Sequence, residues 1–243
     1  MDAVWWALLV AGRVLPGIVL IPAFGGRRVP LPAQLGLAAC AVLLVFERTG
    51  FAGATPDGMR WVALLGKELA VGAVLALAAS CPFAALRIAG QLVDDLRGAS
   101  RTEVVEPTAG GRASPLAVLH LLLACVVFFE LGGPVRLVEA LGHSYTALPV
   151  AAFPDGPLLQ RAGELALALT GAALRLGVEL AWPAAAAVLA ADVVLGFVNR
   201  SAPQLQVFFL GLPLRLALGA AAAALCLEPA ADAFAGFWAW LYY

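Results

Sequence analysis

Six long apolar segments make up most of the chain, and charged side chains interrupt five of them. The segments are Ala3–Phe24, Val29–Phe46, Trp61–Ala89, Pro115–Leu141, Leu165–Val198 and Val207–Leu227. A helix that crosses the ~30 Å hydrocarbon core of a bilayer needs about 20 apolar residues. Only Val29–Phe46 and Leu69–Leu86 approach that length without a charge, at 18 residues each. The chain is therefore too apolar for a soluble protein, yet too often charged for six plain spanning helices.

The composition supports the membrane class. Apolar residues make up 63% of the 243 residues and charged residues 13%, about half of the ~25% usual in a soluble domain. So much apolar sequence excludes a disordered chain, and a net charge of −1 without a basic cluster excludes a nucleic-acid-binding protein. Because no repeat, linker or shift in composition divides the sequence, we predict an all-α membrane protein with a single domain over residues 1–243.

Charged side chains interrupt the apolar segments, among them Arg13, Glu130, Arg175, Glu179, Asp192 and Arg215. Facing lipid, each would cost ~2.5–3.5 kcal/mol. Together they would exceed the net stability of a typical domain, which is about 5–15 kcal/mol. We therefore expect these side chains to face protein, a partner subunit or water.

The fifth segment, Leu165–Val198, is too long for one simple span. As a single helix its 34 residues would measure roughly 51 Å. Pro183 cannot donate its backbone hydrogen bond, which predicts a kink or break there. Arg175 and Glu179 stand four residues apart and can form an ion pair on one helix face. Such a pair fits either a packed interior or the lining of a polar passage.

Residues that carry catalysis or bind metals are scarce. Four cysteines and two histidines stand singly, without metal-ligand spacing, at Cys40, Cys81, Cys125, Cys226, His120 and His143. Neither a G-x-S-x-G nor a G-x-x-x-x-G-K-[ST] motif occurs. We therefore expect no enzyme, no cofactor and no metal site.

The connection Gln91–Ser114 is unusually long and polar. It carries seven charges in 24 residues, at Asp94, Asp95, Arg97, Arg101, Glu103, Glu106 and Arg112. Connections of this length in compact proteins are either functional or disordered. From the residues alone, a solvated surface loop and a functional loop are equally acceptable.

A second polar stretch, Asn199–Gln204, lies between two strongly apolar segments. Pro203 disfavours helix at Ala202, and the Asn199, Ser201 and Gln204 side chains can bind the backbone groups that are released. These residues predict a bend at membrane depth.

The C-terminal tail carries an apolar stripe at helical spacing, formed by Phe234, Phe237, Trp238 and Leu241. Aromatic side chains of this kind fit a membrane–water boundary. A contact with another subunit would use the same residues.

The stretch Arg200–Phe208 resembles the R-x-x-P-Q-[LM]-N-V-F signature of the FliR/SctT family, the inner-membrane components of type III protein export. Gln206 departs from the usual Asn. Further matching blocks follow the chain in order: Pro22, Phe24, Gly25 and Pro30; Lys67, Glu68 and Gly72; Ala89, Gly90, Asp94, Arg97 and Gly98; Gly132 and Gly133; Ser144, Tyr145, Leu148 and Pro149; Pro213, Leu214 and Arg215. The Asp94 and Gly132 blocks look more like the injectisome branch than the flagellar branch.

The resemblance implies an export gate in the bacterial inner membrane, within the basal body, built from kinked or broken helical hairpins. Its implied partners are SctR/FliP-like and SctS/FliQ-like subunits, other export apparatus proteins and unfolded substrates, with lipid around the assembly. A loop that plugs the portal would comprise Gly98, Arg101, Glu103, Glu106, Pro107, Gly110, Gly111 and Arg112. The helix-bend motif would comprise Asn199, Arg200, Pro203, Gln204, Gln206, Val207 and Phe208. Charges buried or between subunits would be Arg13, Lys67, Glu68, Asp94, Arg97, Glu130, Arg175, Glu179, Asp192 and Arg215.

A small-solute secondary transporter is the main alternative, because it would also show broken helices and intramembrane charges. Such a transporter would work alone, whereas a gate subunit would be purified with partners.

Overall fold

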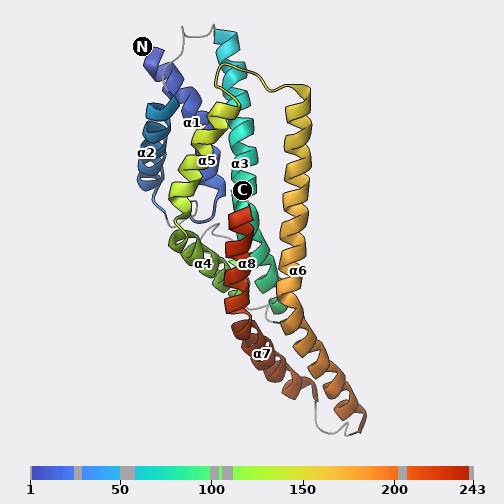
Figure 1. The fold of residues 1–243 in the computed structure, drawn as a ribbon. Coiled ribbons are helices and arrows are strands. Elements are labelled where there is room, and N and C mark those ends of the chain that lie inside the picture. The colour runs from blue at the N-terminus through green and yellow to red at the C-terminus, as the bar shows by residue number, and fades with distance from the viewer. Residues whose placement is uncertain are drawn as a thin grey trace. The chain divides into compact units, whose positions relative to one another are not determined.

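The computed structural model describes residues 2–24, 29–49, 58–98, 104–105, 112–201 and 207–240. Over these residues the chain forms eight α-helices (Figure 1). They are α1 (Asp2–Leu20), α2 (Leu31–Thr49), α3 (Gly58–Leu96), α4 (Pro115–Glu130), α5 (Gly133–Ala147), α6 (Gly156–Ser201), α7 (Val207–Leu225) and α8 (Leu227–Trp240). In the same described part, two strands of two residues each, β1 (Val104–Val105) and β2 (Arg112–Ala113), pair in antiparallel fashion. The predicted all-α class is confirmed.

The helices differ in their capacity to cross a membrane. By length and composition, α3 and α6 are each long and apolar enough to span one. The pairs α4–α5 and α7–α8 pass the same test only when each bent pair is taken as one span, which gives two to four spans among the described residues. These apolar helices identify an integral membrane protein.

Helix α6 is longer than predicted and continues through Pro183. Its 46 residues correspond to roughly 69 Å. A proline removes one backbone hydrogen bond, here the one to the Glu179 carbonyl, and the rest of the helix can retain its own. Among the described residues, breaks lie between α4 and α5, where the helix axes differ by 71°, and between α7 and α8, where they differ by 46°.

A glycine pair produces the break between α4 and α5. Gly132 has φ 67°, a left-handed conformation that glycine adopts without strain. A Cβ on Gly133 would lie 2.3 Å from the ring of Phe128. That ring is fully buried and packs edge to face on Phe24, with ring centroids 5.5 Å apart. Both glycines are therefore required by the local structure.

The described chain divides into two compact units. Unit 1 contains residues 1–81, 128–170 and 240–243, and unit 2 contains residues 82–127 and 171–239. The single domain over residues 1–243 stays a prediction.

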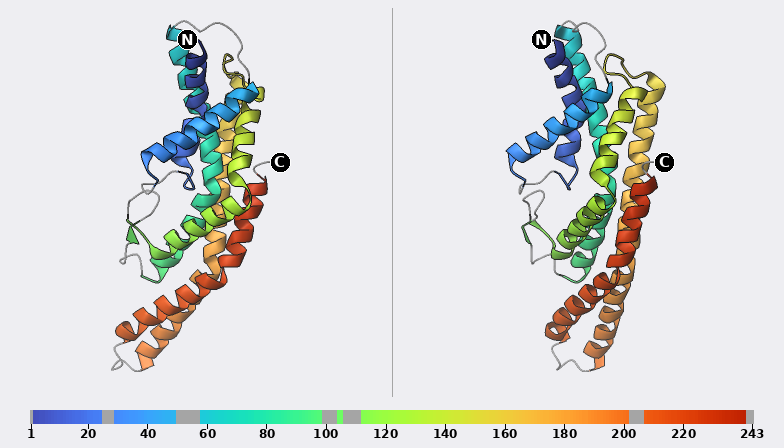
Figure 2. Two further views of the ribbon diagram at one scale, coloured as in Figure 1. Left: turned by 90° about the vertical axis from the view of Figure 1, so that its left-hand side faces the viewer. Right: turned by 60° about the vertical axis from the view of Figure 1, so that its left-hand side comes forward.

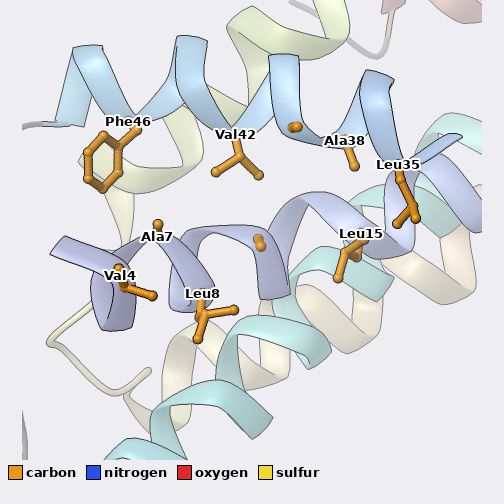
Figure 3. Close-up of a pocket in the computed structure, with 10 residues that line it drawn as sticks. Val4, Ala7, Leu8, Leu15, Leu35, Ala38, Val42 and Phe46 are labelled. Carbon is orange, nitrogen blue, oxygen red and sulfur yellow. The ribbon is translucent and has the colours of Figure 1, made fainter. Parts of the chain in front are cut away.

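In unit 1, α2 packs across α1 (Figures 1 and 2). Beside this contact, Trp6, Leu9 and Leu64 form a buried apolar cluster. An open groove of about 540 Å³ lies between α1 and α2. Its lining side chains, among them Val4 and Val42, are aliphatic or aromatic (Figure 3).

In unit 2, small residues allow close packing of the helices. The buried cluster consists mainly of alanines, joined by Val93 and Leu116: Ala89, Val93, Leu116, Ala181, Ala184 and Ala223. A Cβ on Gly177 of α6 would lie 2.9 Å from the Ala85 carbonyl oxygen of α3. Small residues at such crossings let helix backbones approach closely, as they do in membrane helix pairs.

The C-terminal stripe belongs to the core of unit 2. Phe234 and Trp238 are fully buried, and their rings stack with centroids 6.3 Å apart. Phe234 also packs edge to face on Phe83 of α3, at 5.0 Å. Leu241 lies outside the described residues. Phe234 and Trp238 of the stripe therefore serve internal packing.

Candidate functional site

A buried arginine in the middle of α1 organises the first site. Arg13 has no exposed surface. Its Nε donates to Glu68 Oε2 at 2.6 Å, and its Nη2 donates to Glu68 Oε1 at 3.0 Å. Its Nη1 donates to the carbonyl oxygen of Ser144 at 2.9 Å and to its hydroxyl at 3.1 Å, and Nη2 donates to the Leu148 carbonyl at 2.9 Å. All five N–H groups of the guanidinium are therefore used, as burial of such a charge requires.

Lys67 holds the turn that follows α5. Its ammonium donates to the carbonyl oxygens of Pro149 at 3.2 Å, Val150 at 2.9 Å and Ala152 at 3.0 Å. These three oxygens match its three N–H groups. Lys67 Nζ also forms an ion pair with Glu68 Oε1 at 2.5 Å.

The charges of this site are balanced by a helix end. Arg13 and Lys67 carry two positive charges against the one negative charge of Glu68. The last carbonyls of a helix carry a partial negative charge and lack partners within the helix. Because Arg13 and Lys67 bind carbonyls at and beyond the end of α5, the surplus positive charge lies where the helix dipole favours it.

Tyr145 and Gly72 complete the site. The Arg13 Cζ atom lies 3.9 Å from the centroid of the Tyr145 ring, a cation–π contact. The Tyr145 hydroxyl donates to the Val10 carbonyl at 3.0 Å. A Cβ on Gly72 would lie 2.3 Å from the Arg13 carbonyl oxygen, so α1 and α3 touch through their backbones. We call Arg13, Lys67, Glu68, Ser144 and Tyr145 the Arg13 cluster.

Asp94 and Arg97, at the C-terminal end of α3, form a second site within unit 2. Asp94 is fully buried, and Arg97 is 7% exposed. Arg97 Nε donates to Asp94 Oδ1 at 2.6 Å. The second carboxylate oxygen, Oδ2, accepts the Leu116 backbone N–H in the first turn of α4 at 2.7 Å. Arg97 Nη1 donates to the Leu216 carbonyl of α7 at 3.3 Å. The pair thus joins α3 to both α4 and α7.

Glycines make this second site possible. A Cβ on Gly90 would lie 2.5 Å from the Leu116 carbonyl oxygen, and one on Gly219 would lie 3.0 Å from Arg97 Cδ. Gly98 has φ 74° in the turn that directly follows α3. The block from Ala89 to Gly98 therefore has a local structural explanation.

The other predicted charges are more accessible. Arg175 and Glu179 form the expected ion pair, with Nε and Oε1 2.7 Å apart, but their side chains are 81% and 55% exposed. Asp192 of α6 and Arg215 of α7 also form an ion pair, with about a third of each side chain exposed. In Figure 2, α7 runs back along the C-terminal part of α6. Glu130 is exposed. Of the six charged side chains that we expected to avoid lipid, all within the described residues, only Arg13 is completely buried.

The two predicted motifs are described only in part. In the loop, the backbone of Arg112 pairs with that of Val105. The loop residues outside the described part are Arg101, Glu103, Glu106, Pro107, Gly110 and Gly111. In the helix-bend motif, Asn199 and Arg200 are exposed near the end of α6, and α7 begins at Val207 and Phe208. Pro203, Gln204 and Gln206 lie outside the described residues. Helix α6 ends at Ser201 and α7 begins at Val207, so most of the predicted bend lies outside the described residues.

These clusters favour a structural role over a catalytic one. The N–H groups of Arg13 and Lys67 are all engaged, so neither offers a free donor to a ligand. Within the described ranges, no group of three His, Cys, Asp or Glu side chains could hold a metal ion. Sequence reasoning selected Arg13, Lys67 and Glu68 but missed Ser144 and Tyr145 as their partners.

Comparison with known proteins gives the chain its family. The family of Bacterial export proteins, family 1, matches residues 4–239. The flagellar biosynthetic protein FliR of Pectobacterium carotovorum subsp. carotovorum is 30% identical over 208 residues, which are 85% of this chain and 78% of that protein.

Two relatives come from secretion systems. The Yop proteins translocation protein T of Yersinia pestis is 32% identical over 162 residues, 67% of this chain and 62% of that protein. The secretion system apparatus protein SsaT of Salmonella typhimurium is 34% identical over 157 residues, 64% of this chain and 59% of that protein. Because flagellar and secretion-system proteins both match, assignment to the injectisome branch stays a prediction. The chain belongs to the FliR/SctT family of type III protein export.

Proposed function

We propose that this protein is a subunit of the type III export gate in the bacterial inner membrane, which it crosses several times within the basal body. It assembles with SctR/FliP-like and SctS/FliQ-like subunits, and with further export apparatus proteins, into a helical portal for unfolded substrates. The chain acts by assembly and positioning and is not an enzyme. Family membership supports the role in protein export.

The exposed ion pair on α6 is the observation that carries this proposal. Arg175 and Glu179 lie on a helix whose most apolar 18-residue window is only 28% buried within the chain. Further exposed apolar side chains follow on the same face at helical spacing: Trp182, Leu189, Val193 and Phe197. Lipid against this face would have to accept a charged pair, at a cost of several kcal/mol. A protein neighbour with polar groups of its own accommodates both the pair and the apolar side chains.

Within the portal, two further parts have proposed roles. The loop from Gly98 to Arg112 obstructs the lumen at rest. The helix-bend motif from Asn199 to Phe208 positions α6 and α7 around that lumen. The ion pair between Asp192 and Arg215 supports the second role, since it fixes these two helices to one another.

Purification from the native membrane in mild detergent tests the function. We expect two smaller hydrophobic proteins of the SctR and SctS types to be purified with the tagged chain. A chain that is always purified alone, and that takes up a small solute after reconstitution in liposomes, would instead be a secondary transporter.

The α6 surface is tested separately by exchanging its two charges. The double variant Arg175→Glu with Glu179→Arg keeps an ion pair at the same spacing but reverses its direction. If a partner contacts this face, the variant accumulates normally but loses the partners on purification. The matched control reverses Gln160 and Glu164, another exposed i, i+4 polar pair on α6, and should retain them. Retention of the partners by both variants would exclude this face as the interface.

A further inference from the structure

The first turn of α4 is capped by a residue from another helix. Ser114 immediately precedes α4, the position from which a serine hydroxyl ordinarily caps a helix. Its hydroxyl is buried and has no hydrogen-bond partner among the described residues. The Leu116 N–H, which such a cap would bind, donates to Asp94 Oδ2 at 2.7 Å instead. The local capping residue is therefore present but unused.

Arg97 ties the position of this cap to α7. Its Nε donates to Asp94 Oδ1 at 2.6 Å, and its Nη1 donates to the Leu216 carbonyl at 3.3 Å. A Cβ on Gly219 would lie 3.0 Å from Arg97 Cδ, so the arginine stem lies directly against α7. A movement of α7 relative to α3 must therefore displace Arg97, and with it the carboxylate of Asp94.

We propose that Asp94 and Ser114 are alternative caps of α4, exchanged when α7 moves. With Asp94 in place, the negative carboxylate lies at the positive end of the α4 dipole and holds α3 to α4. When Arg97 draws Asp94 away, the Ser114 hydroxyl accepts the released N–H of Leu116. Helix α4 then keeps a cap while its hydrogen bond to α3 is lost, and Asp94 keeps Arg97 as its partner.

Each of the two states lacks one favourable interaction that the other has. In the observed state the Ser114 hydroxyl is buried without a partner, which is unfavourable. In the other state that hydroxyl is satisfied, but the favourable carboxylate cap is lost. The close approach of Gly90 to the Leu116 backbone lets Asp94 reach α4 without distortion of α3.

A double-mutant cycle on the full chain, purified in detergent with the subunits that accompany it, tests the exchange. The readout is hydrogen–deuterium exchange of a peptide that covers the first turn of α4. We expect Ser114→Ala alone to leave exchange unchanged, because the hydroxyl is unused in the observed state. Asp94→Ala alone should raise exchange moderately, because Ser114 takes over. The double variant should exchange about fivefold faster than Asp94→Ala, the ratio that one lost N-cap produces.

The outcomes separate cleanly. If the double variant exchanges no faster than Asp94→Ala, Ser114 is not a substitute cap and the proposal is wrong. Faster exchange in Ser114→Ala alone also overturns it, since Ser114 would then be in use beside Asp94. Should Asp94→Ala fail to fold, Asp94→Leu keeps the approximate size of the side chain, has no oxygen to accept the Leu116 N–H, and gives the same cycle. Ser80→Ala, which removes a hydroxyl bound within α3, is the control and should show no coupling to Asp94. The measurement follows α4 itself, so its outcome is independent of the proposed role in export.

Discussion

Arg13 and Glu68, 55 positions apart in the sequence, form a two-point ion pair in which neither side chain is exposed. The same arginine binds two backbone carbonyls near the end of α5. This single side chain thus fastens α1, α3 and α5 of unit 1 to one another. Its removal should affect folding before it affects any activity.

The first prediction concerns the charge of Glu68. The variant Glu68→Gln keeps the shape of the side chain but leaves Arg13 and Lys67 as two buried cations without a counter-ion. Loss of one partner of a buried pair costs about 3–5 kcal/mol in the free energy of unfolding. We expect a clearly lower Tm of the detergent-purified chain and less protein in the membrane. The exposed Glu179→Gln is the control and should leave the Tm unchanged; equal losses in both variants would contradict a special role of burial.

The second prediction concerns Lys67, which binds three carbonyls of the turn after α5. In Lys67→Met those carbonyls lose their donor while the apolar stem is kept. We expect faster hydrogen–deuterium exchange and faster proteolysis at residues 148–155, with α1 protected as before. Arg161→Met removes an exposed cation from α6 and should change neither. Equal loosening of α1 and the turn would mean that Lys67 acts on the whole unit.

The third prediction uses two glycines of α3. A Cβ on Gly72 would lie 2.3 Å from the Arg13 carbonyl oxygen, whereas one on Gly66 would meet nothing within 4 Å. Gly72→Ala must therefore push α1 away from α3 and lower the Tm of the purified chain. Gly66→Ala should be neutral or raise stability by about 0.5–1 kcal/mol, because alanine loses less backbone entropy in a helix. A Tm for Gly72→Ala at or above that of Gly66→Ala would contradict the close backbone contact.

The sequence was sufficient to select the charged residues but not their partners. The cost of a charge in lipid predicted that Arg13 faces protein, a partner subunit or water, and the blocks that resemble the family selected Lys67, Glu68, Asp94 and Arg97. Most acceptors of these groups are backbone carbonyls, such as that of Leu148. Every residue has a backbone carbonyl, so the sequence does not show which carbonyls accept these hydrogen bonds; the fold decides which of them lie close enough.

The helix breaks show a similar limit. Pro183 predicted a kink or a break in α6; the helix continues through that position without a break, and the kink stays a prediction. The observed break after α4 depends on Gly132, whose left-handed backbone conformation is compatible with many local structures. The sequence correctly predicted the ion pair of Arg175 and Glu179. It could not predict that both side chains are exposed, because their exposure depends on which helices surround α6.

The fourth prediction concerns the proposed plug, the loop from Gly98 to Arg112. Deletion of residues 101–112 in the assembled complex should make membranes leak small ions or dyes, because the obstruction of the lumen is removed. A matched variant replaces the same twelve residues with a Gly-Ser linker of equal length, and should leak as well if the loop seals by its own side chains. Fluorescent dye release or membrane depolarisation in cells that express the complex measures both variants.

The deleted chain expressed without its partners forms no portal and should not leak, which separates a gate defect from general membrane damage. Unchanged permeability of the deletion complex, with its partners still purified, would remove the plug assignment and leave the role as an export-gate subunit intact.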